Sequence, residues 1–415
     1  MSNNEIINYL DKPEALERLY CRNPKQFLSW FSEAVVEYPE SETLKVWKAR
    51  LTYSTPKSNP TNNTRLLFVI IISLLSVFLV KLPVYFPILD AWFYPRFVPL
   101  IVFSSLIAYF LSGATASIRQ KTLTIAGVAI CVITMMLMPN KQNSASIIMS
   151  QIHMPMVLFS LLALAYMANE WKNPEARLRY IRYIGEVMIY TTLILLGGIV
   201  LTLLTFGLFG LIGISIEKWY MEYVVIWGLV ASPIVATYLY DSVLNRESKL
   251  ATLIANVFAP LFLITVAVYL LAMLYAQKSP YSDRDFLITF NGLLIVVWGI
   301  TVFSISGRRF SSASKGADAV NISLVAITLI INAIALSAIL FRLVEYGVTP
   351  NRVAVTGVNI LIFVHLVLIL MEYIKQLKTT ANSEQLTRSV SNYLPVYTAW
   401  SVFMVILLPI LFKFE

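Results

Sequence analysis

The sequence predicts an all-α, polytopic integral membrane protein with a small soluble helical segment at its N-terminus. Apolar runs about as long as a bilayer core follow one another through residues 66–412. The chain is 58% hydrophobic and only 13% charged, whereas a soluble domain has about 25% charged residues. So few charges cannot cover a soluble fold of 415 residues, and the medium around most of the chain is therefore lipid.

Each apolar run is a candidate transmembrane helix, because a helix needs about 20 residues to cross the hydrocarbon core. We expect about 11 spans, at 66–85, 97–118, 122–138, 147–167, 186–208, 220–240, 251–275, 288–306, 320–343, 353–373 and 396–412. Residues 81–96 mix prolines with aromatic residues and predict an interfacial loop. The stretch 187–216 is long and rich in glycine, so we expect it to tilt, break or run along the interface.

Residues 1–58 predict a cytoplasmic segment of short amphipathic helices. Asp11 with Pro13, and Asn23 with Pro24, resemble helix starts. Apolar residues then recur at helical spacing, at Leu16, Leu19, Tyr20, Phe27, Trp30, Phe31, Leu44, Trp47 and Leu51. About 60 residues form only a marginal core alone, so we expect the segment to dock on the membrane domain or on a protein partner. Residues 59–65 predict a linker, and residues 66–412 the transmembrane domain.

The positions of Lys and Arg predict the orientation of the chain. With the N-terminus in the cytoplasm, the cytoplasmic loops carry more Lys and Arg than the outer loops. The net charge of +9 belongs mainly to these loops, where it suits contact with anionic lipid headgroups. Nucleic-acid binding needs a clustered basic face with aromatic residues; since the sequence has none, we expect no nucleic-acid partner.

Three polar residues fall well inside predicted spans: Asn332 in one run, and Asn359 and His365 in the next. Polar groups at membrane depth are costly and are default functional candidates. The short connection 345–352 predicts an antiparallel hairpin, which places Asn332 and His365 each some 20 Å from the turn. We hypothesise that they hydrogen-bond across the hairpin or line one polar cavity. The alternative is structural, with each bond holding the helices together by about 1 kcal/mol.

The turn of this hairpin is a second candidate site, formed by Arg342, Glu345, Tyr346, Asn351 and Arg352. Arg342 and Glu345 can pair on one helix face, and Arg352 brings a second cation near Glu345. Gly347 suits a helix C-cap, while Thr349 and Pro350 suit the start of the next helix. A well-made helix hairpin with interfacial charges explains the same residues without a function.

The segment Arg-Leu-x-Glu-Tyr-Gly-x-Thr-x-Asn-Arg at 342–352 lies between two hydrophobic helices near the end of the chain. In this it resembles the bacterial membrane family called domain of unknown function 4153. The resemblance implies a multi-pass protein of the bacterial cytoplasmic (inner) membrane. It implies no reaction, substrate or ligand.

The sequence holds few residues suited to chemistry. It has two cysteines and two histidines, and lacks phosphate-binding, dinucleotide-binding and nucleophile-elbow motifs. We therefore expect no cofactor and no metal site. The spans offer no acidic pair near the midplane, which places an intramembrane enzyme last. The leading hypothesis is a transporter or permease-like protein for a small solute or ion, partnered by the lipid bilayer. The alternative is a non-transporting sensor, scaffold or regulatory protein.

Overall fold

The computed structural model describes residues 5–54, 62–113, 116–141, 143–211, 215–244, 284–306, 315–378 and 383–415, and a few single residues between 259 and 267. Every element in these ranges is a helix, which confirms the all-α class. The chain divides into two compact units, Met1–Arg65 and Leu66–Glu415. The division falls at the predicted start of the transmembrane domain. Residues 62–65, expected to end the linker, form the first turn of a helix instead.

The N-terminal unit has three α-helices, α1 (Pro13–Arg22), α2 (Pro24–Glu37) and α3 (Glu42–Ser54), after a short 3-10 turn at Ile7–Tyr9. The side chain of Asn23 accepts a hydrogen bond from the backbone N–H of Gln26, which confirms the predicted cap of α2. The N-cap of α1 is Lys12 rather than Asp11, and its side chain makes no capping bond. The core consists of Ile6, Leu16, Phe27, Phe31, Ala34, Leu44, Trp47 and Leu51. Most of the residues expected from helical spacing therefore face inward.

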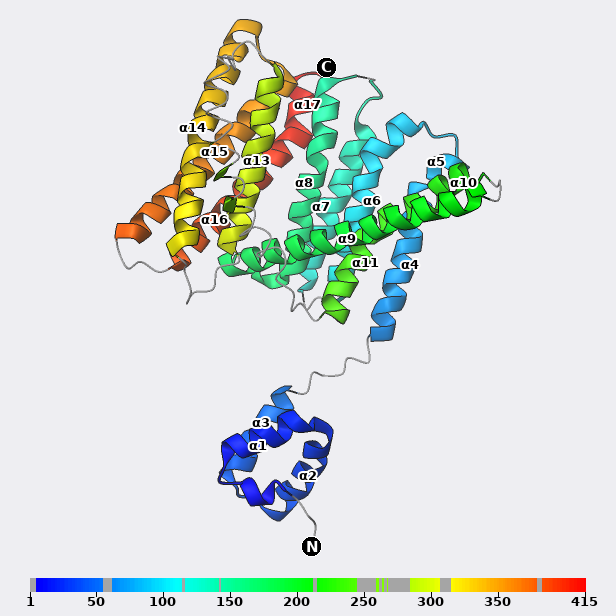
Figure 1. Ribbon diagram of the computed structural model, residues 1–415. Coiled ribbons are helices and arrows are strands. Elements are labelled where there is room, and N and C mark those ends of the chain that lie inside the picture. Colours follow the sequence, from blue (N-terminus) through cyan, green and yellow to red (C-terminus); the bar gives the residue numbers. More distant parts are fainter. Residues whose placement is uncertain are drawn as a thin grey trace. The chain divides into compact units, whose positions relative to one another are not determined.

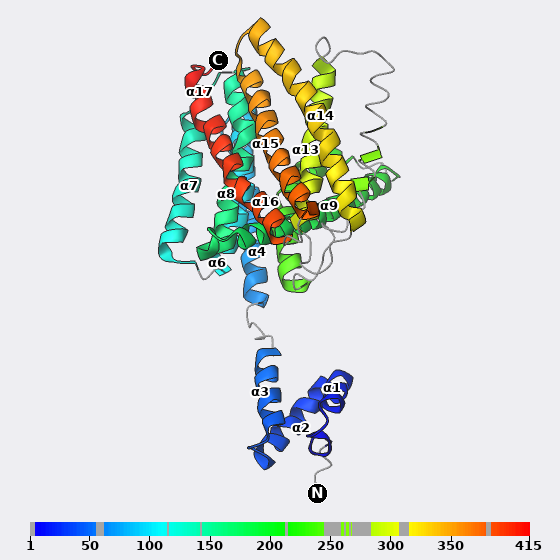
Figure 2. The same cartoon turned by 90° about the vertical axis from the view of Figure 1, so that its left-hand side faces the viewer.

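The second unit begins with α4 (Asn62–Val80), α5 (Leu82–Tyr85), α6 (Asp90–Gly113), α7 (Ile118–Leu137), α8 (Ala145–Met167) and α9 (Pro174–Leu211). It continues with α10 (Glu217–Tyr220), α11 (Ile226–Tyr238), α13 (Arg284–Ser306), α14 (Lys315–Tyr346), α15 (Pro350–Lys378), α16 (Ser383–Val402) and α17 (Leu408–Leu411). Single π-helical turns lie at Met221–Val225, Leu239–Val243 and Phe403–Leu407. Helices α13 to α16 lie against one another (Figures 1 and 2).

The described helices do not confirm the expected count of about 11 spans. Eight of them are long and apolar enough to cross a membrane, and shorter apolar helices lie at Thr64–Val80 and Asn291–Ser306. The predicted run at 251–275 lies outside the described residues except for a few positions. The chain is a membrane protein with several apolar helices, and the number of spans stays a prediction.

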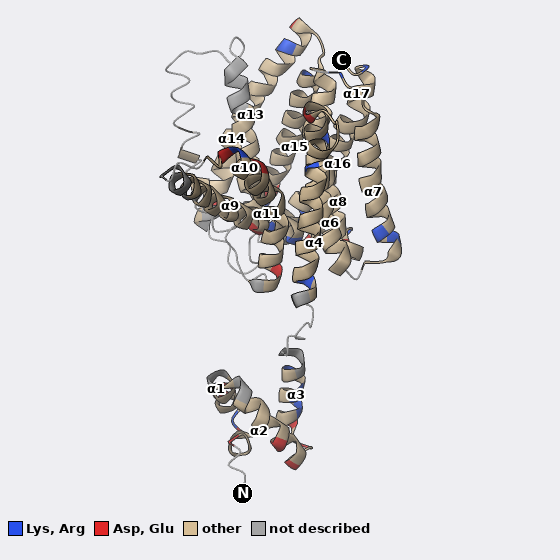
Figure 3. Cartoon of the chain, turned by 90° about the vertical axis from the view of Figure 1, so that its right-hand side faces the viewer, with Lys and Arg blue, Asp and Glu red and all other residues tan. Residues whose placement is uncertain are grey.

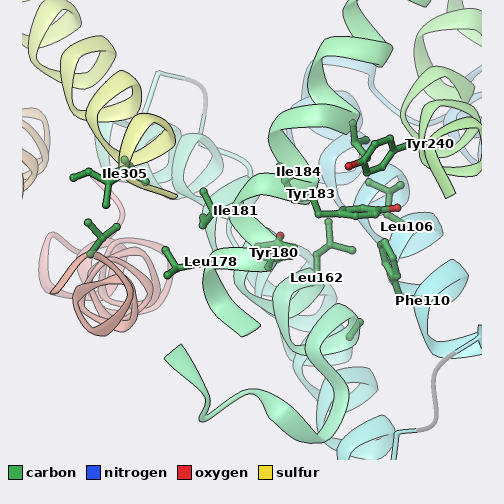
Figure 4. Close-up of a cluster of buried hydrophobic side chains, with 14 of the residues drawn as sticks. Leu106, Phe110, Leu162, Leu178, Tyr180, Ile181, Tyr183, Ile184, Tyr240 and Ile305 are labelled. Atoms are coloured by element: carbon green, nitrogen blue, oxygen red, sulfur yellow. The ribbon is translucent and has the colours of Figure 1, made fainter. Parts of the chain in front are cut away.

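Helix α9 does not follow the direction of its neighbours. It is one unbroken helix over Pro174–Leu211, and in Figure 1 it lies across the other helices rather than alongside them. Its first half presents Tyr180 and Tyr183 to Phe110 of α6 and Leu162 of α8 in the largest core cluster (Figure 4). No break occurs within the described part of this stretch.

The second unit is apolar on its outside and polar at many points inside. Helix α4 exposes Leu67, Ile71, Leu75 and Phe78, as suits a surface in contact with lipid. Along α7 and α14 the ribbon is uncharged except near the helix ends (Figure 3). Asparagine, serine, threonine and histidine side chains are buried instead, above all in α13 to α16.

Candidate functional site

Three asparagine side chains from three helices meet inside the second unit; we call Asn291, Asn332 and Asn359 the amide cluster. The Nδ2 group of Asn332 on α14 donates to the backbone carbonyl of Asn359 on α15 over 3.2 Å. The Nδ2 group of Asn359 donates to Oδ1 of Asn291 on α13 over 2.9 Å and to its own helix at Val355 O over 2.7 Å. Asn332 and Asn359 are each 1% exposed.

These bonds decide which end of each amide is in use. Backbone carbonyls only accept hydrogen bonds, so the atoms facing Asn359 O and Val355 O must be the Nδ2 groups. The oxygens of Asn332 and Asn359 are then left over, and neither Oδ1 atom has a hydrogen-bond partner in the described part of the chain. The cluster therefore presents two unused amide acceptors in a buried setting.

A second group surrounds His365; we call Trp298, His365, Tyr393 and Tyr397 the aromatic cluster. The indole N–H of Trp298 on α13 donates to His365 Nδ1 over 3.0 Å, and the hydroxyl of Tyr397 on α16 lies 3.0 Å from the same nitrogen. The ring of Tyr393 stacks on the imidazole with centroids 4.5 Å apart. The His365 side chain is fully buried.

The Trp298 contact fixes the tautomer of His365. An indole N–H can only donate, so Nδ1 must accept and carries no proton. The ring is then the neutral form with its proton on Nε2. No hydrogen-bond partner for Nε2 is found among the described residues. His365 thus holds one unused N–H donor, on the same helix as Asn359 of the amide cluster.

The structure brings the predicted membrane residues together, but in a different way from the one expected. Asn332 bonds to Asn359 and not to His365, so Asn332 is level with Asn359. His365 lies six residues farther along α15, a rise of about 9 Å. Asn332 and His365 are about equally far from the turn along the chain, yet they lie at different levels. The reason is that the end of α14 extends past the level at which α15 begins. All three side chains face the interior rather than lipid.

Asn291, Trp298, Tyr393 and Tyr397 were not among the residues expected from the sequence. Asn291 lies in the apolar run 288–306 and could have been found by the rule that selected Asn332, since an amide in a span is costly. Trp298 and Tyr397 gave no such signal, because aromatic residues are common in spans. Only the packing of α13 and α16 against α15 places them beside His365.

The candidate residues at the hairpin turn form a helix-capping arrangement. Gly347 has a positive φ of 78°, as expected for a C-cap, and Thr349 Oγ1 accepts from the backbone N–H of Arg352 over 3.4 Å. Arg352 Nη1 donates to the carbonyls of Tyr346 and Gly347 over 2.7 and 2.6 Å. Within the described residues no ion pair involves Glu345, and Asn351 is exposed. The expected pairing of Glu345 is replaced by an Arg352 bond to the end of α14.

Two buried cations lie elsewhere in the unit and were not selected from the sequence. Arg96 of α6, 3% exposed, donates to Met138 O and Pro139 O over 2.9 Å each and to Met135 O over 3.3 Å. It caps the carbonyl end of α7, where positive charge is favourable. Lys81 Nζ lies 3.6 Å from Glu222 and 4.5 Å from the Tyr223 ring centroid.

In the described residues, no group of histidine, cysteine and acidic side chains is placed to hold a metal ion. Comparison with known protein families, curated proteins and solved structures finds no match for this chain. The chemistry of the two clusters is therefore the main guide to function.

Proposed function

We propose that the second unit binds a small polar solute or ion between α13, α14, α15 and α16 and carries it across the membrane. One observation supports this: Asn332 Oδ1, Asn359 Oδ1 and His365 Nε2 are buried atoms without a partner in the described residues. A buried polar atom left unpaired costs about 1–3 kcal/mol. A bound solute or water would hydrogen-bond to these atoms and remove that free-energy penalty.

A purely structural role fits these residues less well. Side chains that hold transmembrane helices together work by satisfying each other. Here two Nδ2 groups donate the interhelical bonds of the amide cluster, and Asn359 O and Asn291 Oδ1 accept them. The remaining acceptors and the Nε2–H of His365 add nothing to helix association. Their burial therefore favours a site that is filled by something other than the chain.

The cellular setting is part of the proposal. The positive-inside bias of the loops and the resemblance of residues 342–352 to domain of unknown function 4153 both favour a bacterial inner membrane with a cytoplasmic N-terminus. Green fluorescent protein fused to the N-terminus should then fluoresce in bacterial cells. A dark fusion that is nonetheless inserted in the membrane would contradict this orientation.

A non-transporting sensor, scaffold or regulator remains the second candidate. It is favoured by the N-terminal unit, which has its own core and divides from the rest at Arg65. Such a unit suits binding to a protein partner. A co-purifying protein that is lost when residues 1–58 are deleted, together with no flux, would favour this role.

The transport proposal is tested by flux through reconstituted vesicles. Proteoliposomes are challenged with glycerol, urea and potassium chloride, and volume changes are followed by light scattering. We expect at least one probe to cross faster than in empty vesicles, and H365A and N332L to abolish that difference. I330A is the control, since Ile330 lies on the same helix and faces outward, 57% exposed. Equal rates for every probe in protein-containing and empty vesicles would exclude the proposal.

A further inference from the structure

Helix α14 carries a row of buried polar side chains that extends beyond the amide cluster. Asn321, Thr328 and Asn332 are separated by seven and four residues, close to two turns and one turn, so they share one face of the helix. None is more than 2% exposed. Together they extend over about 16 Å of the helix axis.

The contacts at the two ends of this row place it along α13. Asn321 Nδ2 near the start of α14 donates to Ser304 Oγ near the end of α13 over 3.0 Å. At the other end Asn332 joins the cluster that includes Asn291, near the start of α13. The two helices are therefore antiparallel, and the row follows their contact from the middle of α14 toward its first turns.

Each member of the row has an unused polar atom. The Oδ1 atoms of Asn321 and Asn332 and the Oγ1 atom of Thr328 are buried with no partner in the described part of the chain. The same holds for Oγ1 of Thr301, one turn before Ser304 on α13. These are hydrogen-bond acceptors, and the threonine hydroxyls can donate as well.

The two threonines depart from the usual behaviour of this residue in helices. A helical threonine commonly donates its hydroxyl to the carbonyl four residues earlier, as Thr134 does to Ile130 over 2.8 Å and Thr237 to Pro233 over 2.7 Å. Thr301 and Thr328 make no such bond. Their hydroxyls are therefore free to bond to a guest molecule.

We propose that this row is a hydrated path joining the amide cluster to the end of the bundle where α13 ends and α14 begins. Its acceptor atoms suit water and solutes that carry O–H or N–H donors or a positive charge, and disfavour anions. This inference rests on the proposed function and adds to it the side of access and the class of solute. The inference concerns the hydration of the row and the charge that it favours. It can therefore be tested without knowing the substrate.

The test is the reactivity of single cysteines toward water-soluble thiol reagents. N321C, T328C and N332C are made in a chain carrying C21S and C131A, and each is reconstituted into vesicles. The reagents are two methanethiosulfonates of similar size, one with an aminoethyl cation and one with a sulfonatoethyl anion. I330C is the matched control, because position 330 lies between two members of the row but faces outward.

We expect T328C and N332C to react at least about tenfold faster than I330C, because the reactive thiolate forms only where water is present. The cationic reagent should react about tenfold faster than the anionic one. T328C conserves side-chain size, so the test stands even where N332C weakens the fold. Rates no faster than that of I330C would exclude the path, and equal rates for the two reagents would exclude the solute class. Fast labelling of these cysteines in a protein that shows no flux in vesicles would support the hydrated path and exclude the transport function.

Discussion

The side-chain amide of Asn332 donates to the backbone carbonyl of Asn359 over 3.2 Å and ties α14 to α15 in the interior of the second unit. Because the acceptor is a carbonyl, the bond sets the amide orientation and leaves Asn332 Oδ1 unused. A side chain selected for helix association alone would not retain a buried acceptor of this kind. The bond therefore ties two helices together and leaves one buried acceptor of Asn332 available.

Replacing Asn332 by leucine should leave the protein as stable as before or slightly more stable. The loss of one interhelical bond, about 1 kcal/mol, is offset because leucine brings no polar oxygen that the chain leaves unpaired. N332D should be clearly destabilising, since a carboxylate would face the Asn359 carbonyl without the donor. Thermal unfolding in detergent compares the three proteins. A melting temperature for N332L well below that of N332D would contradict the assignment of the free oxygen.

The tautomer of His365 is directly measurable, because the chain has only two histidines. With ¹⁵N-labelled histidine, NMR at neutral pH should show one ring protonated on Nε2 and accepting at Nδ1. H153Q removes the other histidine and assigns the signal. W298F should change the Nδ1 shift, since the indole donor 3.0 Å away is lost. A ring protonated on Nδ1, or on both nitrogens, would overturn the donor role of Nε2.

Sequence reasoning located the candidate site along the chain but not in space. Asn332, Asn359 and His365 could be selected because polar residues in apolar runs are rare and costly. Their partners could not be selected, because they depend on which helices are neighbours. The distance from the turn also predicted His365 as the partner of Asn332, whereas the bond is made to Asn359. That prediction assumed that both helices begin at the same level.

The same limits apply to the fold. Helical periodicity predicted the core of the N-terminal unit, including Phe27 and Trp47. It could not predict that α9 lies across its neighbours, which is decided by packing against α8, α11, α13 and α16. The interfacial loop expected at 81–96 is largely helical, with Pro95 inside α6. Prolines in the early turns of a long helix give the same sequence signal as a loop, and the burial of Arg96 follows from packing alone.

Replacing Arg96 by methionine should destabilise the second unit. The guanidinium donates to three carbonyls at the end of α7, and methionine fills a similar volume without any donor. Loss of these charge-assisted bonds should cost about 2–3 kcal/mol. R96K keeps the charge but loses the planar set of guanidinium donors. Its unfolding temperature should therefore lie between those of the parent protein and R96M. Unfolding temperatures in detergent measure the order, and an R96M protein as stable as the parent would show that water or lipid replaces the cap.

The close contact between α15 and α16 at Gly357 gives a prediction with a matched control. A methyl group on Gly357 would lie 2.1 Å from Cζ2 and Cη2 of Trp400, and an indole ring packed in a helix interface cannot move aside cheaply. G357A should therefore cost about 1–3 kcal/mol through overpacking. At Gly299 in α13 a methyl group meets nothing within 4 Å, so G299A should gain up to about 1 kcal/mol from helix propensity. Denaturation of both variants in detergent checks the pair. A neutral G357A would mean that Trp400 does not hold α16 against Gly357, while a destabilising G299A would mean that another segment covers α13 there.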